Sequence, residues 1–212
     1  MDANFWHQVW QQDQLGFQLS EAHPLLRAQL AALPAVSCVF VPLCGKSPDL
    51  HVLAQQYQVV GAELSQIACR DFFAEAQLSV SPLDVGAFTL WQANQYQLWQ
   101  GDFFELPPQA VQGCQLIYDR AALIALPAAM RQHYVQKLRQ LLPKASLLLI
   151  SLEYPEGEKQ GPPFTVAEAE IEQLFEFADI NLCGIRNLTG QGFARRKFAT
   201  SQLVEKSWLI TW

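Results

Sequence analysis

Val39-Phe40-Val41-Pro42-Leu43-Cys44-Gly45-Lys46-Ser47 is the stretch that decides the fold, because it passes from an apolar run into a tight polar loop. The apolar run, residues 37–42, is short and bounded by turn residues, which predicts a buried strand. After the loop, Ser47 suits a helix N-cap, Pro48 the first helical position and Asp49 the first turn. A buried strand, a loop and a helix in this order form the repeating unit of α/β sheets.

Strand and helix patterns alternate along the rest of the chain. Apolar runs predict further strands at 59–63, 89–92, 96–100, 116–119, 146–152, 180–185 and 206–211. Helical spacing predicts helices at 4–12 and 24–33, from 48 to 57, from 65, after 127, and once more before the last two strands. This alternation implies a mostly parallel sheet with helices on both faces and an antiparallel edge. Without a repeat or a linker, residues 1–212 form a single domain.

Composition excludes several classes of protein. Fourteen basic and twenty acidic side chains leave a net charge of −6. A protein with this net charge is not expected to bind nucleic acid or an anionic membrane through electrostatic attraction. The five cysteines contain no CxxC pair and the four histidines have no metal-ligand spacing, so we expect neither a metal site nor a disulfide framework. No secretory signal and no bilayer-length apolar run are present. We therefore expect a soluble, cytoplasmic, monomeric protein with reduced thiols.

Polar residues gather where the predicted parallel strands end, which is where ligands bind in open α/β sheets. Gly45 allows a ligand to approach the loop backbone, and the loop leads into a helix N-terminus that favours an anion. Glu63 ends the next strand, where an acidic side chain accepts hydrogen bonds from both ribose hydroxyls. Asp102 could accept a hydrogen bond from an adenine amino group, and Phe103 could stack on the ring. Together these residues describe a site for a nucleoside joined to an anionic group.

Three cofactor classes fit that description to different degrees. A phosphate-binding P-loop requires a glycine five positions before Gly45, where Phe40 stands. A nicotinamide or flavin site requires the G-x-G-x-x-G pattern, and this turn has one glycine. S-adenosylmethionine, with its ribose, adenine and carboxylate, is the remaining ligand of this shape.

The sequence resembles the thiopurine S-methyltransferase family, in particular its bacterial members. The similarity spans essentially the whole chain, and the Pro-Leu-Cys-Gly-Lys-Ser hexapeptide is a specific marker because it replaces the glycine-rich loop usual in methyltransferases. The segments that carry the resemblance are Phe5-Trp6-His7 with Trp10, 39–47, 59–65, Arg70-Asp71-Phe72-Phe73, Gly101-Asp102-Phe103-Phe104, 118–127 and Gly161-Pro162-Pro163-Phe164.

The resemblance implies a class I methyltransferase with a seven-stranded sheet, which moves a methyl group from S-adenosylmethionine to the sulfur of thiopurines and related aromatic thiols. Selenium and tellurium species are further acceptors at the level of the family. The family's cofactor contacts match Trp10, Leu43, Glu63 and Arg120, and the segment around Asp102 and Phe103 matches the surroundings of the adenine. Phe17 matches a residue beside the substrate, and the helix at 4–12 matches a lid.

Alternatives remain open for the function and for single residues. The chain could methylate another small nucleophile, such as a halide or small thiol, or bind S-adenosylmethionine without turnover. Glu63 could be an exposed strand end, Asp102 an ordinary turn residue, and Trp6 with Trp10 part of a core. Asp119 and Arg120 could form a structural ion pair, although Arg120 is our candidate for positioning charge.

Loop residues receive fewer assignments. Lys46 is expected to be a solvated loop charge without a role, and Cys44 a packing residue. Residues 187–197 do not align with the family pattern, so Arg195 and Arg196 receive no role.

Overall fold

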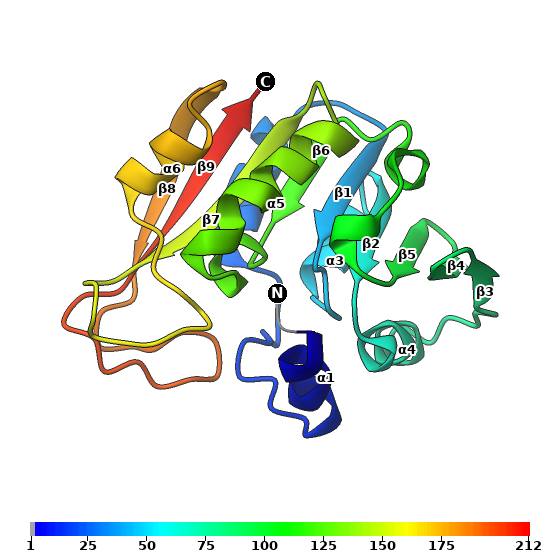
Figure 1. Ribbon diagram of the computed structural model, residues 1–212, viewed down its shortest axis with the longest axis horizontal. Coiled ribbons are helices and arrows are strands. Elements are labelled where there is room, and N and C mark those ends of the chain that lie inside the picture. The colour runs from blue at the N-terminus through cyan, green and yellow to red at the C-terminus, as the bar shows by residue number, and fades with distance from the viewer. Residues whose placement is uncertain (1–2) are drawn as a thin grey trace.

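A mixed sheet of nine strands organises residues 3–212, the part of the chain that this computed structural model describes (Figure 1). Its order is β3-β4-β5-β2-β1-β6-β7-β9-β8. The strands are β1 Cys38–Pro42, β2 Gln58–Glu63, β3 Leu83–Val85, β4 Phe88–Ala93, β5 Tyr96–Gln100, β6 Leu116–Asp119, β7 Ser146–Glu153, β8 Asp179–Asn187 and β9 Val204–Thr211.

The centre of the sheet is parallel and both of its edges are antiparallel. β5, β2, β1, β6 and β7 pair in parallel, and β9 and β8 add the predicted antiparallel edge. The expected count of seven strands is too low, because β4 and β3 extend the opposite edge in antiparallel pairs. β4 corresponds to the strand predicted at 89–92. β3 consists of three exposed residues and therefore has no burial pattern that a sequence could reveal.

Residues 3–212 contain six α-helices, of which α1 lies beyond the ends of the central strands and the others flank the sheet (Figure 1). The six helices are α1 Ala3–Gln11, α2 Pro24–Gln29, α3 Asp49–Leu53, α4 Gln66–Glu75, α5 Ala128–Leu141 and α6 Glu168–Leu174. Short 3-10 helices lie at Leu30–Ala32, Phe103–Glu105, Pro108–Val111 and Leu123–Ala125. α5 and α6 pack on one face through side chains such as Tyr134 and Ile171, whereas α2, α3 and α4 pack on the other through Leu26, Leu50 and Phe72.

Two predicted helices are shorter than expected. The helix expected at 24–33 ends at Gln29 and continues as a 3-10 turn. α3 has five residues, and its N-cap is Pro48, not Ser47, although the Ser47 Oγ still accepts a 3.2 Å hydrogen bond from the Asp49 N–H. The carboxylate of Asp49 is taken up by tertiary contacts, namely the N–H of His23 at 2.6 Å and the hydroxyl of Tyr118 at 2.9 Å. That an anion binds at this helix N-terminus stays a prediction.

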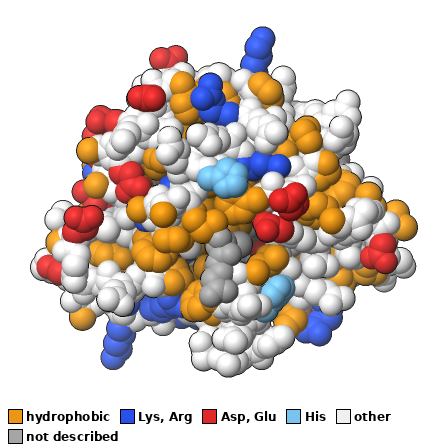
Figure 2. Space-filling view, in the orientation of Figure 1, with side chains coloured by type: hydrophobic (Ala, Val, Ile, Leu, Met, Phe, Trp, Pro, Cys, Tyr) orange, Lys and Arg blue, Asp and Glu red, His pale blue; other side chains and the backbone are white. Residues whose placement is uncertain are grey.

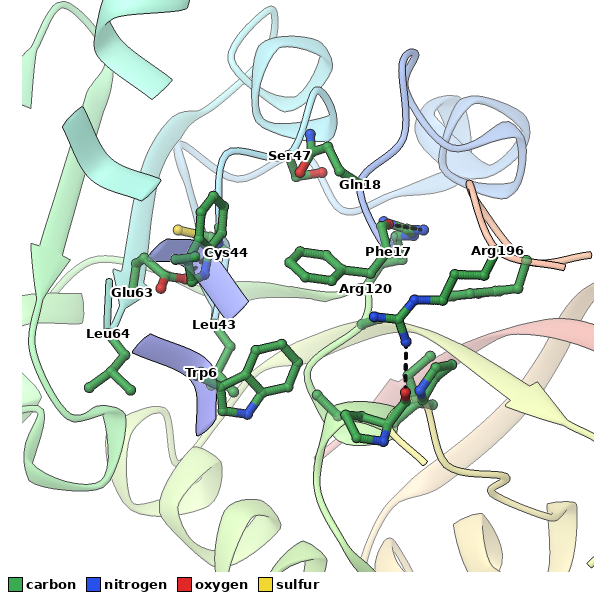
Figure 3. A pocket seen from close by; sticks show the side chains of 18 residues that line it. Trp6, Phe17, Gln18, Leu43, Cys44, Ser47, Glu63, Leu64, Arg120 and Arg196 are labelled. Atoms are coloured by element: carbon green, nitrogen blue, oxygen red, sulfur yellow. Dashed lines mark hydrogen bonds between the residues drawn. The ribbon is translucent and has the colours of Figure 1, made fainter. Parts of the chain in front are cut away.

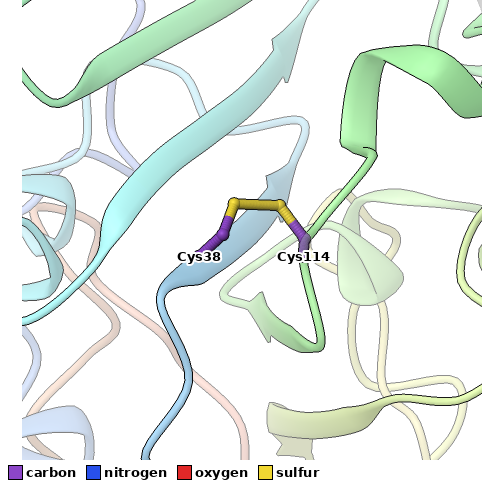
Figure 4. The surroundings of a disulfide bond; sticks show 2 residues. All are labelled: Cys38 and Cys114. Carbon is purple, nitrogen blue, oxygen red and sulfur yellow. A yellow bond between two sulfur atoms is a disulfide. The ribbon is translucent and has the colours of Figure 1, made fainter.

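The expectation that all five cysteines are free thiols is also wrong. Cys38 and Cys114 form a disulfide, with a Cα–Cα distance of 4.5 Å (Figure 4). The parallel pairing of β1 with β6 places Val39 opposite Leu116, and so brings together two cysteines that are 76 residues apart. The spacing of the cysteines in the sequence does not indicate which two of them pair.

Charged groups are scattered over the face that Figure 2 shows. Lysine and arginine side chains stand apart from one another there, and acidic side chains lie among them. No helix in residues 3–212 combines the length and the apolar character that a membrane crossing requires.

Candidate active site

A cavity opens at the carboxyl edge of the parallel strands, where the sequence analysis expects the site (Figure 3). Figure 3 shows Glu63 on one side of this cavity and Arg196 on the opposite side, with Phe17 between them. The lining residues come from α1 and the loop after it, the loop after β1, the end of β2, the segment after β6, and two loops near the antiparallel edge. They are Trp6, Trp10, Phe17, Gln18, Leu43, Cys44, Gly45, Ser47, Glu63, Leu64, Arg120, Ala121, Ile124, Ala125, Pro162, Pro163, Phe193 and Arg196.

The loop after β1 adopts an unusual backbone that turns its N–H groups toward β2. Leu43 and Gly45 both have positive φ angles, 47° and 55° respectively. Residues other than glycine rarely adopt this backbone conformation. The N–H of Cys44 donates to the carbonyl of Ala62 at 3.0 Å, and that of Gly45 donates to the Glu63 carboxylate at 2.8 Å. A Cβ at Gly45 would lie 3.4 Å from the Trp10 ring. Because glycine has no Cβ, only backbone atoms of Gly45 contribute to this part of the cavity wall.

Glu63 is a buried carboxylate and not an exposed strand end. Its side chain accepts hydrogen bonds from the Ser65 N–H at 2.7 Å and from the Gly45 N–H at 2.8 Å, and 7% of the residue is exposed. Burial raises the pKa of Glu63, and the backbone N–H groups that it accepts oppose that rise. A carboxylate offers about four lone-pair sites, so each oxygen can accept one further hydrogen bond from a ligand in the cavity.

Arg120 is a buried cation with spare hydrogen-bonding capacity. Its Nη2 donates to the carbonyl of Phe17 at 3.5 Å, and the guanidinium lies 5.7 Å from the centre of the Phe193 ring. The buried Nε has no hydrogen-bond partner. A buried donor without a partner costs free energy, and a ligand carboxylate in this cavity would satisfy it.

Asp119 does not form an ion pair with Arg120, and instead faces the opposite side of the sheet. Its carboxylate accepts hydrogen bonds from the Ala122 and Leu123 N–H groups at 2.8 and 3.2 Å, and from the Tyr134 hydroxyl at 2.7 Å. Burial raises the pKa of Asp119 to about 6, against the opposing effect of these hydrogen bonds. Asp119 therefore anchors the segment that carries Arg120.

The N-terminal segment contributes an aromatic wall. The rings of Trp6 and Trp10 each meet the Phe17 ring edge-on, with centroids 5.8 and 5.9 Å apart. Trp10 also packs with Val9 and Ala68 in a small cluster separate from the two main clusters of the core. Trp10 is thus both a packing residue and a wall of the cavity. That α1 moves as a lid stays a prediction.

Arg196 and Phe193 reach the cavity although the sequence analysis assigned them no role. The N–H of Arg195 donates to the carbonyl of Gly16 at 3.1 Å, which fastens this segment to the N-terminal loop. The Arg196 guanidinium donates to the carbonyl of Pro162 at 2.9 Å and packs on Gly16, where any side chain would collide with it. A glycine beside Phe17 was the available sequence signal, but it does not identify its partner.

Asp102 and Phe103 lie outside the lining of the cavity. Phe103 is 2% exposed and stacks on Phe40 in the core, with ring centroids 6.4 Å apart. Asp102 is exposed and accepts a 2.9 Å hydrogen bond from the N–H of Phe104, at the start of a 3-10 helix. Asp102 therefore acts as a turn residue. A contact of Asp102 or Phe103 with adenine stays a prediction.

The cavity offers the donors and acceptors that S-adenosylmethionine requires. Glu63 retains acceptor capacity for ribose hydroxyls, and the unpartnered Nε of Arg120 suits a carboxylate. Gly45 leaves room for a ligand against the loop backbone. Aromatic rings supply the apolar surroundings for the rest of the molecule.

Comparison with known proteins agrees with this chemistry. The family model described as Thiopurine S-methyltransferase (TPMT) matches residues 1–211. The chain belongs to the thiopurine S-methyltransferase family. A thiopurine S-methyltransferase of Shewanella baltica strain OS155 is 40% identical over 215 residues, which cover 99% of each chain. One from Vibrio vulnificus strain YJ016 is 48% identical over 180 residues, or 82% of this chain and 81% of the relative.

Solved structures share the fold of this family member. An S-adenosylmethionine-dependent methyltransferase from Anabaena variabilis superimposes with a TM-score of 0.68 at 18% identity, over 99% of this chain and 94% of the other. The N-terminal domain of EvdMO1, solved with S-adenosylhomocysteine bound, has a TM-score of 0.60 at 9% identity, over 99% and 96% of the two chains. The protein is therefore an S-adenosylmethionine-dependent methyltransferase with the class I fold, and S-adenosylmethionine is its methyl donor.

Proposed function

We propose that this enzyme methylates the sulfur of thiopurines and related aromatic or heterocyclic thiols. The observation that carries the proposal is the composition of the cavity wall near Phe17. The flat rings of Phe17 and Phe193 stand beside two cations, Arg120 and Arg196, in one partly closed cavity. A planar, anionic sulfur heterocycle matches that combination of apolar faces and positive charge. The names of the relatives point to the same acceptor.

We propose further that the cofactor lies along the β1 and β2 side of the cavity. Glu63 would hold the ribose, Arg120 the carboxylate, and Trp10, Leu43 and Gly45 the walls beside them, which is supported by their shared position at the cavity. Asp102 and Phe103 would meet the adenine, as the family resemblance implies. Arg120 then lies between the cofactor and Phe17, and acts as the residue that positions charge.

In this reaction the residues of the chain exclude water and place charge, and none of them reacts covalently. When bound, S-adenosylmethionine would supply an electrophilic methyl carbon for the acceptor sulfur, with S-adenosylhomocysteine as the thioether leaving group. Trp6, Trp10 and Phe17 exclude water from the acceptor sulfur, and the two arginines favour its thiolate form. Aromatic thiols already ionise in part near neutral pH, so a strong base is not required.

The proton of the acceptor leaves without a dedicated base in this scheme. The lining residues of the described chain include no histidine. Both oxygens of Glu63 hold backbone N–H groups, and burial raises the pKa of Cys44, with the Glu63 carboxylate and Cys69 adding to the rise. We therefore propose that solvent accepts the proton before the acceptor enters. Reduced selenium and tellurium species ionise readily as well, and belong to the same proposal as further acceptors.

Methyl transfer from labelled S-adenosylmethionine to 6-mercaptopurine tests the proposal, with S-adenosylhomocysteine measured in parallel. Hypoxanthine, which carries oxygen in place of sulfur, is the matched control, and an aliphatic thiol and a halide probe the alternative acceptors. Saturable transfer to 6-mercaptopurine alone supports the proposal. Transfer to the halide or the aliphatic thiol alone would replace the acceptor class. Binding of S-adenosylhomocysteine without any turnover would indicate a non-catalytic binding protein.

The assembly and location of the enzyme are also proposals. We propose that it is a monomer, which light scattering of the eluting protein can test. We propose that it acts in the cytoplasm on small molecules and not on nucleic acid or membranes, which cell fractionation and binding assays can test. The net charge of −6 supports the exclusion of nucleic acid.

A further inference from the structure

Lys46 is less exposed than its place in a loop suggests. Its side chain is 14% exposed, and its ammonium lies 2.6 Å from a carboxylate oxygen of Glu75 and 4.0 Å from one of Asp71. The backbone carbonyl of Lys46 accepts a 3.0 Å hydrogen bond from the Gln18 side chain, which lines the cavity. Lys46 thus connects the loop after β1 both to α4 and to the N-terminal segment.

The loop that contains Lys46 requires such restraints. Leu43 adopts a positive φ that carries a steric cost for a residue with a side chain. Backbone conformations of this kind persist where surrounding contacts hold them in place. The restraints on the amino-terminal half of the loop are the hydrogen bonds of Cys44 and Gly45 to the end of β2. On the other half, the Ser47 N–H donates to the Cys44 carbonyl at 3.3 Å, Gln18 donates to the Lys46 carbonyl, and the Lys46 side chain adds the contact with α4.

α4 is the element that holds the Lys46 side of the loop, whereas β2 holds the Cys44 and Gly45 side. It begins directly after Glu63 and its N-cap Ser65, and its ten residues span about 15 Å. Gly45 is tied to Glu63 near the start of this helix, whereas Lys46 is tied to Glu75 at its end. One attachment at the end of β2 and a second at the end of α4 together fix the orientation of the loop, which one attachment would leave free to rotate.

The charges on α4 make the second attachment specific. Asp71 and Glu75 are four residues apart and therefore neighbours on one face of the helix, where like charges repel. The Lys46 ammonium lies 2.6 Å from Glu75 and 4.0 Å from Asp71, whereas Arg70 pairs with Asp71 at 2.7 Å. The two cations together offset that repulsion, and Lys46 is the one that pairs closely with Glu75. Because most of the lysine side chain is buried, solvent screens its pair with Glu75 less than it would a fully exposed pair.

We propose that Lys46 and Glu75 form a positioning pair that holds the Leu43–Ser47 loop against α4 and so sets the affinity for the cofactor. The inference rests on the proposed placement of the cofactor between this loop and Glu63. Without the pair, the loop spends part of its time in conformations that do not bind, and the apparent affinity falls by that fraction. Chemistry in the fully bound enzyme is unchanged, so the effect falls on KM for the cofactor and leaves kcat in place.

Calorimetric titration with S-adenosylhomocysteine tests the pair in Lys46→Met, Glu75→Ala and the double variant. Each single variant should raise the dissociation constant about fivefold, and the double variant should match the singles because both break one contact. The charge-swapped enzyme, Lys46→Glu with Glu75→Lys, should recover most of the affinity. Lys206→Met is the matched control, since Lys206 is 15% exposed and pairs with Glu168 at 3.0 Å on another part of the surface.

Specific outcomes would overturn the pair. One such outcome is a dissociation constant within twofold of the parent for both Lys46→Met and Glu75→Ala. Another is a double variant whose loss of affinity equals the sum of the single losses. A third is an equal loss of affinity in Lys206→Met. Glu75 is 59% exposed, so its alanine variant remains informative even where Lys46→Met fails to fold. If Glu63→Gln also leaves the affinity unchanged, the proposed cofactor placement fails. If Glu63→Gln weakens binding and the pair variants do not, only the positioning role fails.

Discussion

The Gly45 N–H donates a 2.8 Å hydrogen bond to Glu63, which joins the loop after β1 to the last residue of β2. The two residues are eighteen positions apart in the chain, and this contact places the carboxylate for which we propose a ribose-binding role beside the Gly45 loop. The same carboxylate also accepts the Ser65 N–H. Changes at Glu63 therefore act on the ligand and on the loop together.

Glu63→Gln should weaken S-adenosylhomocysteine binding by about thirtyfold, or about 2 kcal/mol, because hydrogen bonds to a charged acceptor are lost. The amide also presents a donor to backbone N–H groups that require an acceptor. Calorimetric titration should show a similar loss for 5′-methylthioadenosine, which keeps the ribose but has no carboxylate. Unchanged affinity for both ligands would remove Glu63 from the cofactor site.

Arg120→Ala should lower kcat/KM for methyl transfer about 100-fold, or about 2.7 kcal/mol, with little change in the melting temperature. The guanidinium Nε is buried without a protein partner, so its loss removes a ligand contact more than a structural one. Binding of S-adenosylhomocysteine should weaken, whereas binding of 5′-methylthioadenosine should stay within about twofold. Equal losses for the two ligands would place Arg120 elsewhere than at the carboxylate, and unchanged kinetics would remove its role.

Phe17→Ala should raise KM for 6-mercaptopurine about tenfold, because the acceptor loses an aromatic face. The Phe17 carbonyl that accepts from Arg120 belongs to the backbone and remains in the variant. Affinity for S-adenosylhomocysteine should therefore stay within about twofold. Steady-state kinetics with varied acceptor, alongside a cofactor titration, separates the two effects. A larger loss for the cofactor than for the acceptor would contradict the assignment.

Asp119→Asn should change how stability depends on pH. Burial raises the pKa of Asp119 from 3.8 to about 6, so ionisation is harder in the folded chain than in the unfolded one. The wild type therefore loses up to about 3 kcal/mol as the pH rises from about 4 to about 6, and the loss stays constant above that range. The asparagine side chain does not ionise, so the stability of the variant lacks this dependence on pH. Urea unfolding of both proteins at pH 4 to 8 should show the difference, and parallel profiles would exclude it.

Cys44 should resist alkylation in the folded enzyme although it lines the cavity. Burial raises the pKa of its thiol, and the carboxylate of Glu63 raises it further, so little reactive thiolate exists near neutral pH. Cys183 is a free cysteine that is partly exposed and should react first. Peptide mapping after iodoacetamide treatment measures both sites. Rapid labelling of Cys44 in folded protein would show that its surroundings are less apolar than described.

Local signals were sufficient for the parallel half of the site. The run that ends at Pro42 and the acidic residue that closes β2 are short-range patterns, and parallel strands bring their carboxyl ends to one edge. The helix predicted from residue 65 is present with Ser65 as its N-cap, whose hydroxyl accepts from the Ala68 N–H at 3.4 Å. Glu63 and Arg120 therefore reach the cavity as expected.

Long-range contacts account for the rest. Arg196 reaches the cavity because its neighbour Arg195 bonds to Gly16, which lies 179 residues earlier. The carboxylate of Asp49 accepts the N–H of His23, which lies 26 residues earlier, and not an N–H of its own helix. Neither contact has a periodic or local signature in the chain.

β9 lies between β7 and β8 in the sheet although it follows β8 in the chain. During synthesis from the N-terminus, β8 therefore leaves the ribosome before the strand with which it must pair. Phe193 and Arg196 lie between β8 and β9, so their wall of the cavity takes its place only when this edge closes. A nascent chain can thus assemble the β1 and β2 side of the cavity first, and gains the Phe193 and Arg196 side last.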